Sequence, residues 1–70
     1  MFELYARVED CGNGFGYSIL HDEQDGIYEI AALKDGKYWP NTIIHDSKYG
    51  YPLRGDWALV VRTMVKIARL

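Results

Sequence analysis

Hydrophobic and polar residues alternate strictly at the start of the chain. From Phe2 to Glu9 the apolar side chains fall on one side of an extended backbone, and the other side carries Tyr5, Arg7 and the glutamates. A period of two predicts a half-buried β-strand. Residues 10–14 follow and contain an Asn-Gly pair, which favours the tight turn of a β-hairpin.

The same pattern of strands and turns continues to residue 40. Residues 15–21 predict a second strand, residues 22–26 a polar turn ending in glycine, and residues 27–34 a third strand. Asp35-Gly36 predicts a second tight turn, and the fourth strand begins at Lys37 and ends near Pro40. The first forty residues are therefore expected to form an antiparallel meander.

Alternation identifies the buried face less clearly in the second and third strands. In the second strand it places Phe15, Tyr17 and Ile19 inward. In the third strand two alternating sets compete, and the pattern does not choose between them: Ile27, Ala31 and Leu33, or Tyr28, Ile30 and Ala32.

Between residues 41 and 56 the periodic pattern fails. The short apolar pair Ile43-Ile44 predicts either an edge strand or a single turn inserted into the core. Two tyrosines follow, Tyr49 and Tyr51, next to a glycine and a proline. They either form an exposed aromatic tip or close over the end of the core.

The C-terminal segment, residues 56–70, favours a helix. Asp56 is a suitable N-cap, and apolar residues recur at helical spacing in the set Trp57, Val60, Val61, Met64, Val65 and Ala68. Several β-branched residues leave a strand as the alternative. The sequence thus predicts one α+β domain over residues 1–70, a four-stranded antiparallel β-meander with a C-terminal α-helix on one face; the alternative is a small all-β barrel.

The predicted helix is more apolar than one sheet face requires. Ten of the fourteen residues from Trp57 to Leu70 are hydrophobic. A second copy of the chain could cover the surplus, so a homodimer is one interpretation. Its surface would use the apolar residues Trp57, Leu59, Ile67 and Leu70 beside the basic stripe of Arg62, Lys66 and Arg69.

Size and composition limit the class of protein. A chain of 70 residues, 49% hydrophobic and 26% charged, is expected to fold but is too short for two hydrophobic cores, which excludes a multidomain enzyme. Cys11 is the only cysteine, so no internal disulfide forms, and no apolar run reaches the length of a membrane span. With no visible signal peptide, we expect a cytoplasmic protein that does not bind membranes.

Candidate residues for catalysis are few. Cys11, His21 and His45 would have to converge in the fold, and acidic neighbours of Cys11 disfavour its thiolate. No spacing typical of a metal site occurs. The glycine-rich run at residues 12–16 leads into a strand and is interpreted as a hairpin turn. We therefore expect no enzyme activity, no cofactor and no bound metal.

Charge is unevenly distributed and indicates the type of partner. Residues 1–35 carry a net charge of −6, and residues 36–70 carry +4. The acidic residues gather in the predicted turn at Asp22, Glu23 and Asp25, with Glu29 just beyond. Such a cluster would attract a basic partner.

The resulting hypothesis is a non-catalytic protein-binding module. Its surface would combine this acidic cluster with exposed tyrosines at positions 5, 49 and 51 (Tyr5, Tyr49 and Tyr51). A small inhibitor or regulator of a nucleic-acid-handling protein, of the kind that phages and mobile elements encode, fits these properties. One alternative is a nucleic-acid or small-ligand binder that uses an aromatic sheet face and the stripe of Arg62, Lys66 and Arg69, although the negative charge disfavours nucleic acid. The other alternative is a structural homodimer.

Overall fold

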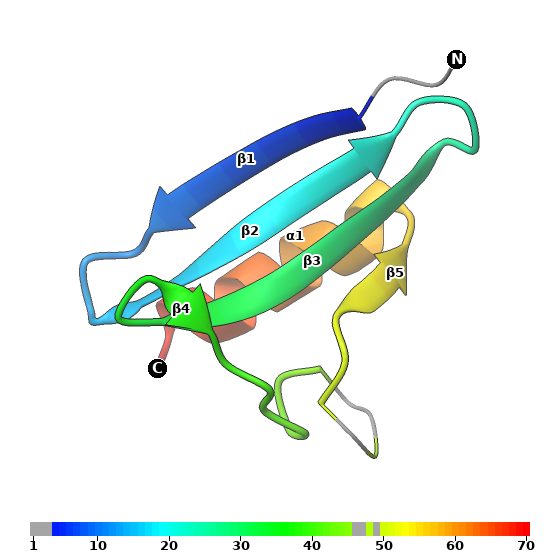
Figure 1. The fold of residues 1–70 in the computed structure, drawn as a ribbon. Helices are drawn as coiled ribbons and strands as arrows, with labels where there is room; N and C mark the ends of the chain where they lie inside the picture. The colour runs from blue at the N-terminus through cyan, green and yellow to red at the C-terminus, as the bar shows by residue number, and fades with distance from the viewer. Residues whose placement is uncertain (1–3, 46–47, 49) are drawn as a thin grey trace.

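An antiparallel sheet and one C-terminal helix make up the structure. The computed structural model describes residues 4–45, 48 and 50–70. The helix crosses one face of the sheet and the opposite face is open (Figure 1). The elements in chain order are β1 (Leu4–Asp10), β2 (Phe15–Asp22), β3 (Ile27–Lys34), β4 (Lys37–Tyr38), β5 (Leu53–Gly55) and α1 (Trp57–Ala68).

The predicted α+β class and helix are confirmed, and the barrel alternative is wrong because the sheet is open. The sheet follows the predicted meander from β1 to β4, and it gains a fifth strand that the sequence pattern does not predict. This strand, β5, pairs with residues 28–30 of β3 on the same edge that β4 occupies further along. The pair Ile43-Ile44 lies in a turn: Ile44 is buried, whereas Ile43 is 82% exposed.

Turn chemistry explains the two hairpins predicted from glycine pairs. Asp35 and Gly36 both adopt positive φ, 53° and 80°, as a two-residue hairpin turn requires. The β1–β2 turn is longer than two residues. Its positive φ values fall at Gly12 and Gly14, and Asn13 between them does not adopt one. The Asn13 side chain accepts a hydrogen bond from the backbone N–H of Phe15, and its amide donates to the last carbonyls of α1.

The core lies between the helix and the middle of the sheet. From the sheet it takes Ile19, Ile30 and Ala32, with Tyr17 and Tyr28 packed at its margin. The predicted inward set of β2 is therefore confirmed at Ile19 and Tyr17, and in β3 the set with Tyr28, Ile30 and Ala32 faces the helix. Ala31 and Leu33 of the competing set are also buried, on the other face.

The predicted face of the helix is confirmed at Val60 and at Met64, which packs against the core, and is wrong at other positions. Its buried residues are Val60, Thr63 and Ile67, whereas Val61 and Val65 are exposed. Thr63 is tolerated in the core because its hydroxyl donates to the carbonyl of Leu59 at 2.9 Å. Asp56 is the N-cap, as predicted, and its carboxylate accepts from the N–H of Leu59 at 3.0 Å.

The helix packs on β2, β3 and β5 and does not cover strand β1. Arg7 lies opposite the core residue Ile19 and therefore on the helix side, whereas Val8 lies opposite Ser18 on the open face. The expectation that the apolar side of this strand faces the core is thus wrong at Val8, which is 70% exposed.

Candidate functional site

The acidic turn, residues 22–26 between β2 and β3, forms where it was predicted. The carboxylate of Asp22 stabilises it. Asp22 accepts hydrogen bonds at its side chain from the N–H groups of Gln24 (3.0 Å) and Asp25 (3.4 Å), and at its carbonyl from Gly26 (2.8 Å). This is an Asx-type turn closed by a glycine at positive φ. Glu23 and Asp25 are exposed, so they are the carboxylates available to a partner.

Glu29 does not belong to the tip of this turn. It lies in β3 opposite Leu20 and Arg54, on the open face, and is partly buried. The Nε atom of Arg54 is 3.8 Å from a carboxylate oxygen of Glu29. This exposed ion pair partly neutralises Glu29, which therefore contributes less to the acidic surface than its sequence position indicated.

Of the predicted tyrosines, the structure brings the backbone of Tyr5 next to the acidic turn but places Tyr51 elsewhere. Tyr51 is 66% exposed, but it lies in the β4–β5 loop, which Figure 1 shows at the far end of the molecule from the β2–β3 turn. Tyr5 pairs through its backbone with His21. Tyr49 lies outside the described residues.

A tryptophan takes the place that the tyrosines were expected to fill. The ring of Trp57 lies 5.1 Å from that of Tyr28, and the Tyr28 ring stacks on His21 at 4.1 Å with an angle of 7° between the planes. His21 and Tyr28 face each other one position inside the acidic turn. Trp57 keeps 49% of its surface exposed, so a large ring packed against Tyr28 remains available at the end of the sheet where the β2–β3 turn lies.

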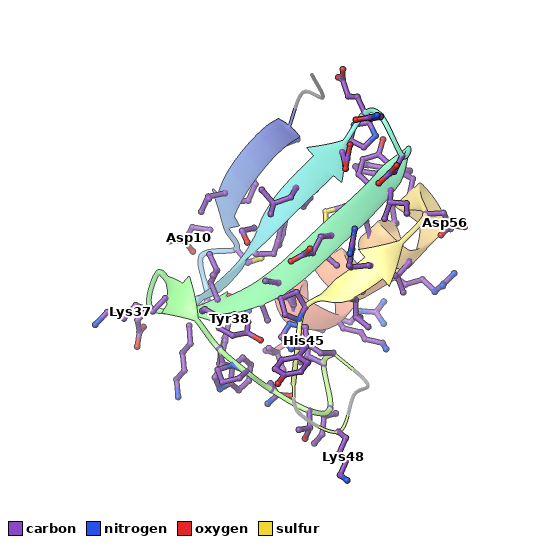
Figure 2. The ribbon with its side chains drawn as sticks, turned by 45° about the vertical axis from the view of Figure 1, so that its right-hand side comes forward. Asp10, Lys37, Tyr38, His45, Lys48 and Asp56 are labelled. Atoms are coloured by element: carbon purple, nitrogen blue, oxygen red, sulfur yellow. The ribbon has the colours of Figure 1, made fainter. Side chains whose placement is uncertain are left out.

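We call this region the acidic end. It consists of the β2–β3 turn, the aromatic stack and the helix N-cap, and its residues are His21, Asp22, Glu23, Asp25, Tyr28, Asp56 and Trp57. Asp56 belongs to it because the preceding residue, Gly55, pairs with Tyr28; Figure 2 shows Asp56 where β5 meets the helix. Hairpin register alone could have paired His21 with Tyr28, but no local signal brings Trp57 to them.

The residues proposed for a helix-mediated dimer do not form one surface. Ile67 is fully buried and packs with Ala32 and Ile44, so its assignment to an exposed dimer face is wrong. Leu59 is partly buried beside Gly55, whereas Leu70 and Trp57 are exposed. Arg62, Lys66 and Arg69 are exposed on the helix.

These basic residues are also separate from the aromatic side of the sheet. Tyr17 and Tyr28 pack against the core beneath the helix, so they do not form an open platform. The helical positions of Arg62 and Lys66 point away from the buried stripe of Val60 and Ile67. The surface required for stacking nucleotide bases next to basic side chains is therefore not assembled from these residues.

Cys11, His21 and His45 do not converge. Cys11 adjoins Phe15 at one end of β2 and His21 lies near the other end, about 20 Å away at the rise of a β-strand. His45 meets β3 at Ala32, whereas His21 meets it at Tyr28, a separation of about 13 Å along the strand. No group of three or more His, Cys, Asp or Glu side chains in the described residues is arranged to hold a metal ion.

His45 instead completes the edge of the sheet. Between the segments of β3 paired to β4 and β5, the carbonyl of Ala32 accepts from Trp39 N–H at 2.9 Å, and the N–H of Ala32 donates to Nε2 of His45 at 3.0 Å. Since Nε2 accepts, Nδ1 carries the proton and donates to the carbonyl of Asn41 at 3.0 Å. Figure 2 shows His45 beside Tyr38, whose ring centroid is 6.1 Å away. Both ring nitrogens of His45 thus form hydrogen bonds with backbone groups.

Burial lowers the pKa of His45 below its usual 6.5, so the ring is neutral in the folded protein at pH 7. The unfolded chain binds a proton near pH 6.5 and the folded chain only at lower pH. Stability from this group is therefore complete above about pH 6.5, and below it the unfolding free energy falls by about 1.4 kcal/mol per pH unit until the folded pKa is reached. Urea titrations between pH 7.5 and 5 should show this slope.

The matched control for this pH dependence is His45→Gln, which keeps an acceptor but cannot be protonated. It retains every other titrating group of the chain, so the difference between the two proteins isolates His45. Parallel stability curves for the wild type and this variant below pH 6.5 would contradict the assignment.

Tyr17 is the other side chain with a displaced pKa. Burial raises its pKa above 10, with Cys11 and Glu9 adding in the same direction and Arg7 opposing them. The phenol is therefore protonated at neutral pH and serves as part of the core margin.

Comparisons with known proteins do not assign the chain to a group. No protein family matches it, and no curated protein or solved structure is significantly similar to it. Among the described residues no pocket of ligand size is found. In the same part of the chain, no helix combines the length and hydrophobicity needed to cross a membrane.

Proposed function

We propose that this chain is a non-catalytic protein-binding module that engages a basic partner through the acidic end. The observation that carries the proposal is the half-exposed Trp57 ring packed against Tyr28, at the end of the sheet where the β2–β3 turn carries the exposed Glu23 and Asp25. Tryptophan is enriched among the residues that dominate binding energy at protein interfaces. An exposed tryptophan next to a compact negative charge suits a surface rich in Lys and Arg.

The mechanism has two stages. Glu23 and Asp25 steer a positively charged partner toward this end of the sheet and raise the association rate. Trp57 is then buried against the partner, where an Arg or Lys side chain can stack on its ring. Because the stack with Tyr28 and His21 already orients the ring, little side-chain entropy is lost on binding.

The partner class follows from this chemistry. A protein that handles nucleic acid presents a groove of Lys and Arg side chains for phosphates, and the acidic end would compete with nucleic acid for that groove. The module would then act as an inhibitor or regulator. This extension rests on charge complementarity and on the position of Trp57.

The test is affinity capture from nuclease-treated lysate of the source cell or its host, with identification by mass spectrometry and measurement of affinity for the captured protein. We expect Trp57→Ala to weaken binding about thirtyfold, equivalent to about 2 kcal/mol, because it removes the central anchor. The double variant Glu23→Gln/Asp25→Asn should slow association and reduce its salt dependence. It leaves Asp22 in place, since that residue holds the turn.

The matched control is Thr42→Lys/Ile43→Lys. It changes the net charge by the same amount at two exposed positions in the distant β4–β5 loop. One partner retained by the wild type and this control, but lost by the two acidic-end variants, would support the proposal. Equal capture by all four proteins would refute it.

A further inference from the structure

The outer edge of β1 is the longest unpaired strand edge in the described part of the chain. β1 is the end strand of the sheet, seven residues long, and pairs with β2 on one side only (Figure 1). A strand edge of this length presents a row of N–H and C=O groups that can pair with another strand. The helix does not cover this strand, so an added strand would meet no obstacle from it.

The register shows which residues face outward along this edge. The N–H of Cys11 donates to the carbonyl of Phe15 at 2.9 Å, so this is a hydrogen-bonded pair of the β1–β2 hairpin. Antiparallel pairs alternate between bonded and non-bonded, and Arg7 and Glu9 therefore bond to β2. The backbone groups of Ala6, Val8 and Asp10 point to the outer edge.

We propose that β1 pairs antiparallel with β1 of a second copy of the chain, about a two-fold axis at Val8, so that the two sheets become one. Val8 then exchanges both backbone hydrogen bonds with Val8 of the second copy, and Ala6 does so with Asp10. Arg7 faces Glu9 of the second copy on the helix side, in a non-bonded pair where side chains approach most closely. Two-fold symmetry repeats that ion pair.

Charge selects this register from its alternatives. Two-fold registers that pair at least five residues of β1 are centred on Ala6, Arg7 or Val8. Centring on Arg7 places two Arg7 side chains opposite each other, which is unfavourable. Centring on Ala6 places Arg7 opposite Tyr5. The register at Val8 pairs opposite charges twice and covers an apolar side chain that is 70% exposed in the single chain.

The side chains of Arg7 and Glu9 are already arranged for such a pairing. They form an ion pair within one strand, with Nε of Arg7 2.6 Å from Oε1 of Glu9, and both lie on the same face. In the dimer the two strands would combine these four side chains into an alternating network. The interface is small, with about six backbone hydrogen bonds, which is typical of a reversible dimer.

Charge-swapped variants test the dimer in solution. Sedimentation velocity of the full chain from about 1 μM to 1 mM should show a monomer–dimer equilibrium. Arg7→Glu and Glu9→Arg each place like charges opposite each other, and we expect each variant to dimerise at least tenfold more weakly. An equimolar mixture of the two should recover dimerisation, because each strand then faces its opposite charges.

A second mixture, Glu23→Arg with Arg62→Glu, has the same two net charges as the β1 mixture and controls for general attraction between the chains, since both positions are exposed and lie outside the proposed strand pairing. This mixture should dimerise no more strongly than the wild type. A wild type that stays monomeric up to 1 mM would overturn the proposal. So would single β1 variants that dimerise normally, or a β1 mixture that gains nothing over them.

Cross-linking tests the register itself. In a Cys11→Ser background, Val8→Cys should form a disulfide-linked dimer under mild oxidation, because the two residues meet at the axis. Ala6→Cys should cross-link much more slowly, since its opposite residue is Asp10 of the second copy. Circular dichroism would show that both variants are folded. Equal rates at the two positions would overturn the register.

Discussion

His45→Ala is expected to lose about 4 kcal/mol of unfolding free energy. The substitution removes a fully buried ring and leaves a cavity. It also leaves the N–H of Ala32, itself fully buried, without its acceptor. A chain of 70 residues has a total stability of about 4–10 kcal/mol, so this loss is a large fraction of the total. Chemical denaturation followed by far-ultraviolet circular dichroism measures the loss.

Two further variants separate the hydrogen bond from the volume of the ring. His45→Gln retains an oxygen that can accept from Ala32, so we expect a loss of about 1–2 kcal/mol. His21→Ala removes a partly exposed ring from the stack on Tyr28 and should cost about 1 kcal/mol. If His45→Ala destabilises the protein no more than His21→Ala, His45 does not complete the sheet edge as described.

Gly50→Ala is expected to cost about 3 kcal/mol. Gly50 is buried at a φ of +69°, and a Cβ on it would lie 2.7 Å from the carbonyl carbon of Pro40 and 2.8 Å from its oxygen. Both atoms are backbone, so the β4–β5 loop must open to admit the methyl group. The left-handed conformation adds a cost of its own for alanine. The same denaturation experiment measures the effect.

Gly26→Ala is the matched control. Gly26 has nearly the same φ, +68°, but nothing lies within 4 Å of its Cβ position. It should therefore show only the backbone cost, about 1 kcal/mol. The difference between the two variants measures the close approach to Pro40, and equal losses would contradict it. Because the carbonyl of Gly50 accepts from the Tyr38 hydroxyl at 2.5 Å, displacing it also disturbs the packing around His45.

The elements that could be predicted from the sequence are those fixed by local chemistry. Asp35-Gly36 carries its own turn geometry, and Asp56 caps its own helix. The acidic turn was predictable for the same reason, since Asp22 bonds to residues two and three positions further on. Alternation within β2 also identified its buried side, because few of its polar residues compete for the core.

What could not be predicted depends on distant residues. β5 has only three residues and no alternation, and it exists because the edge of β3 accepts it. The buried face of the helix was predicted only in part, correctly at Val60 and wrongly at Val61 and Val65, because apolar residues lie on most sides of the helix and its packing on the sheet decides which of them are buried. A threonine enters the core only because its hydroxyl bonds to Leu59.

Of the candidate site, only the acidic residues of the β2–β3 turn could be predicted from the sequence, because they are close together along the chain. Its charges are local, but the aromatic ring that joins them comes from the helix. Tyr51 was a reasonable expectation from exposure, yet the chain path between β4 and β5 carries it to the opposite end of the molecule. The role of His45 had no sequence signal, because its partner is the backbone of Ala32.

The order of the strands also determines the sequence of events in folding. From β1 to β4 each strand pairs with the next in the chain, so these contacts close short loops and form quickly. The helix instead packs on β2, and the side chain of Asn13 reaches the carbonyls of Ile67 and Ala68, which are 54 and 55 positions away. Docking of the helix is therefore the step that closes the longest loop. The hairpins can form and unfold repeatedly until the docked helix stabilises them.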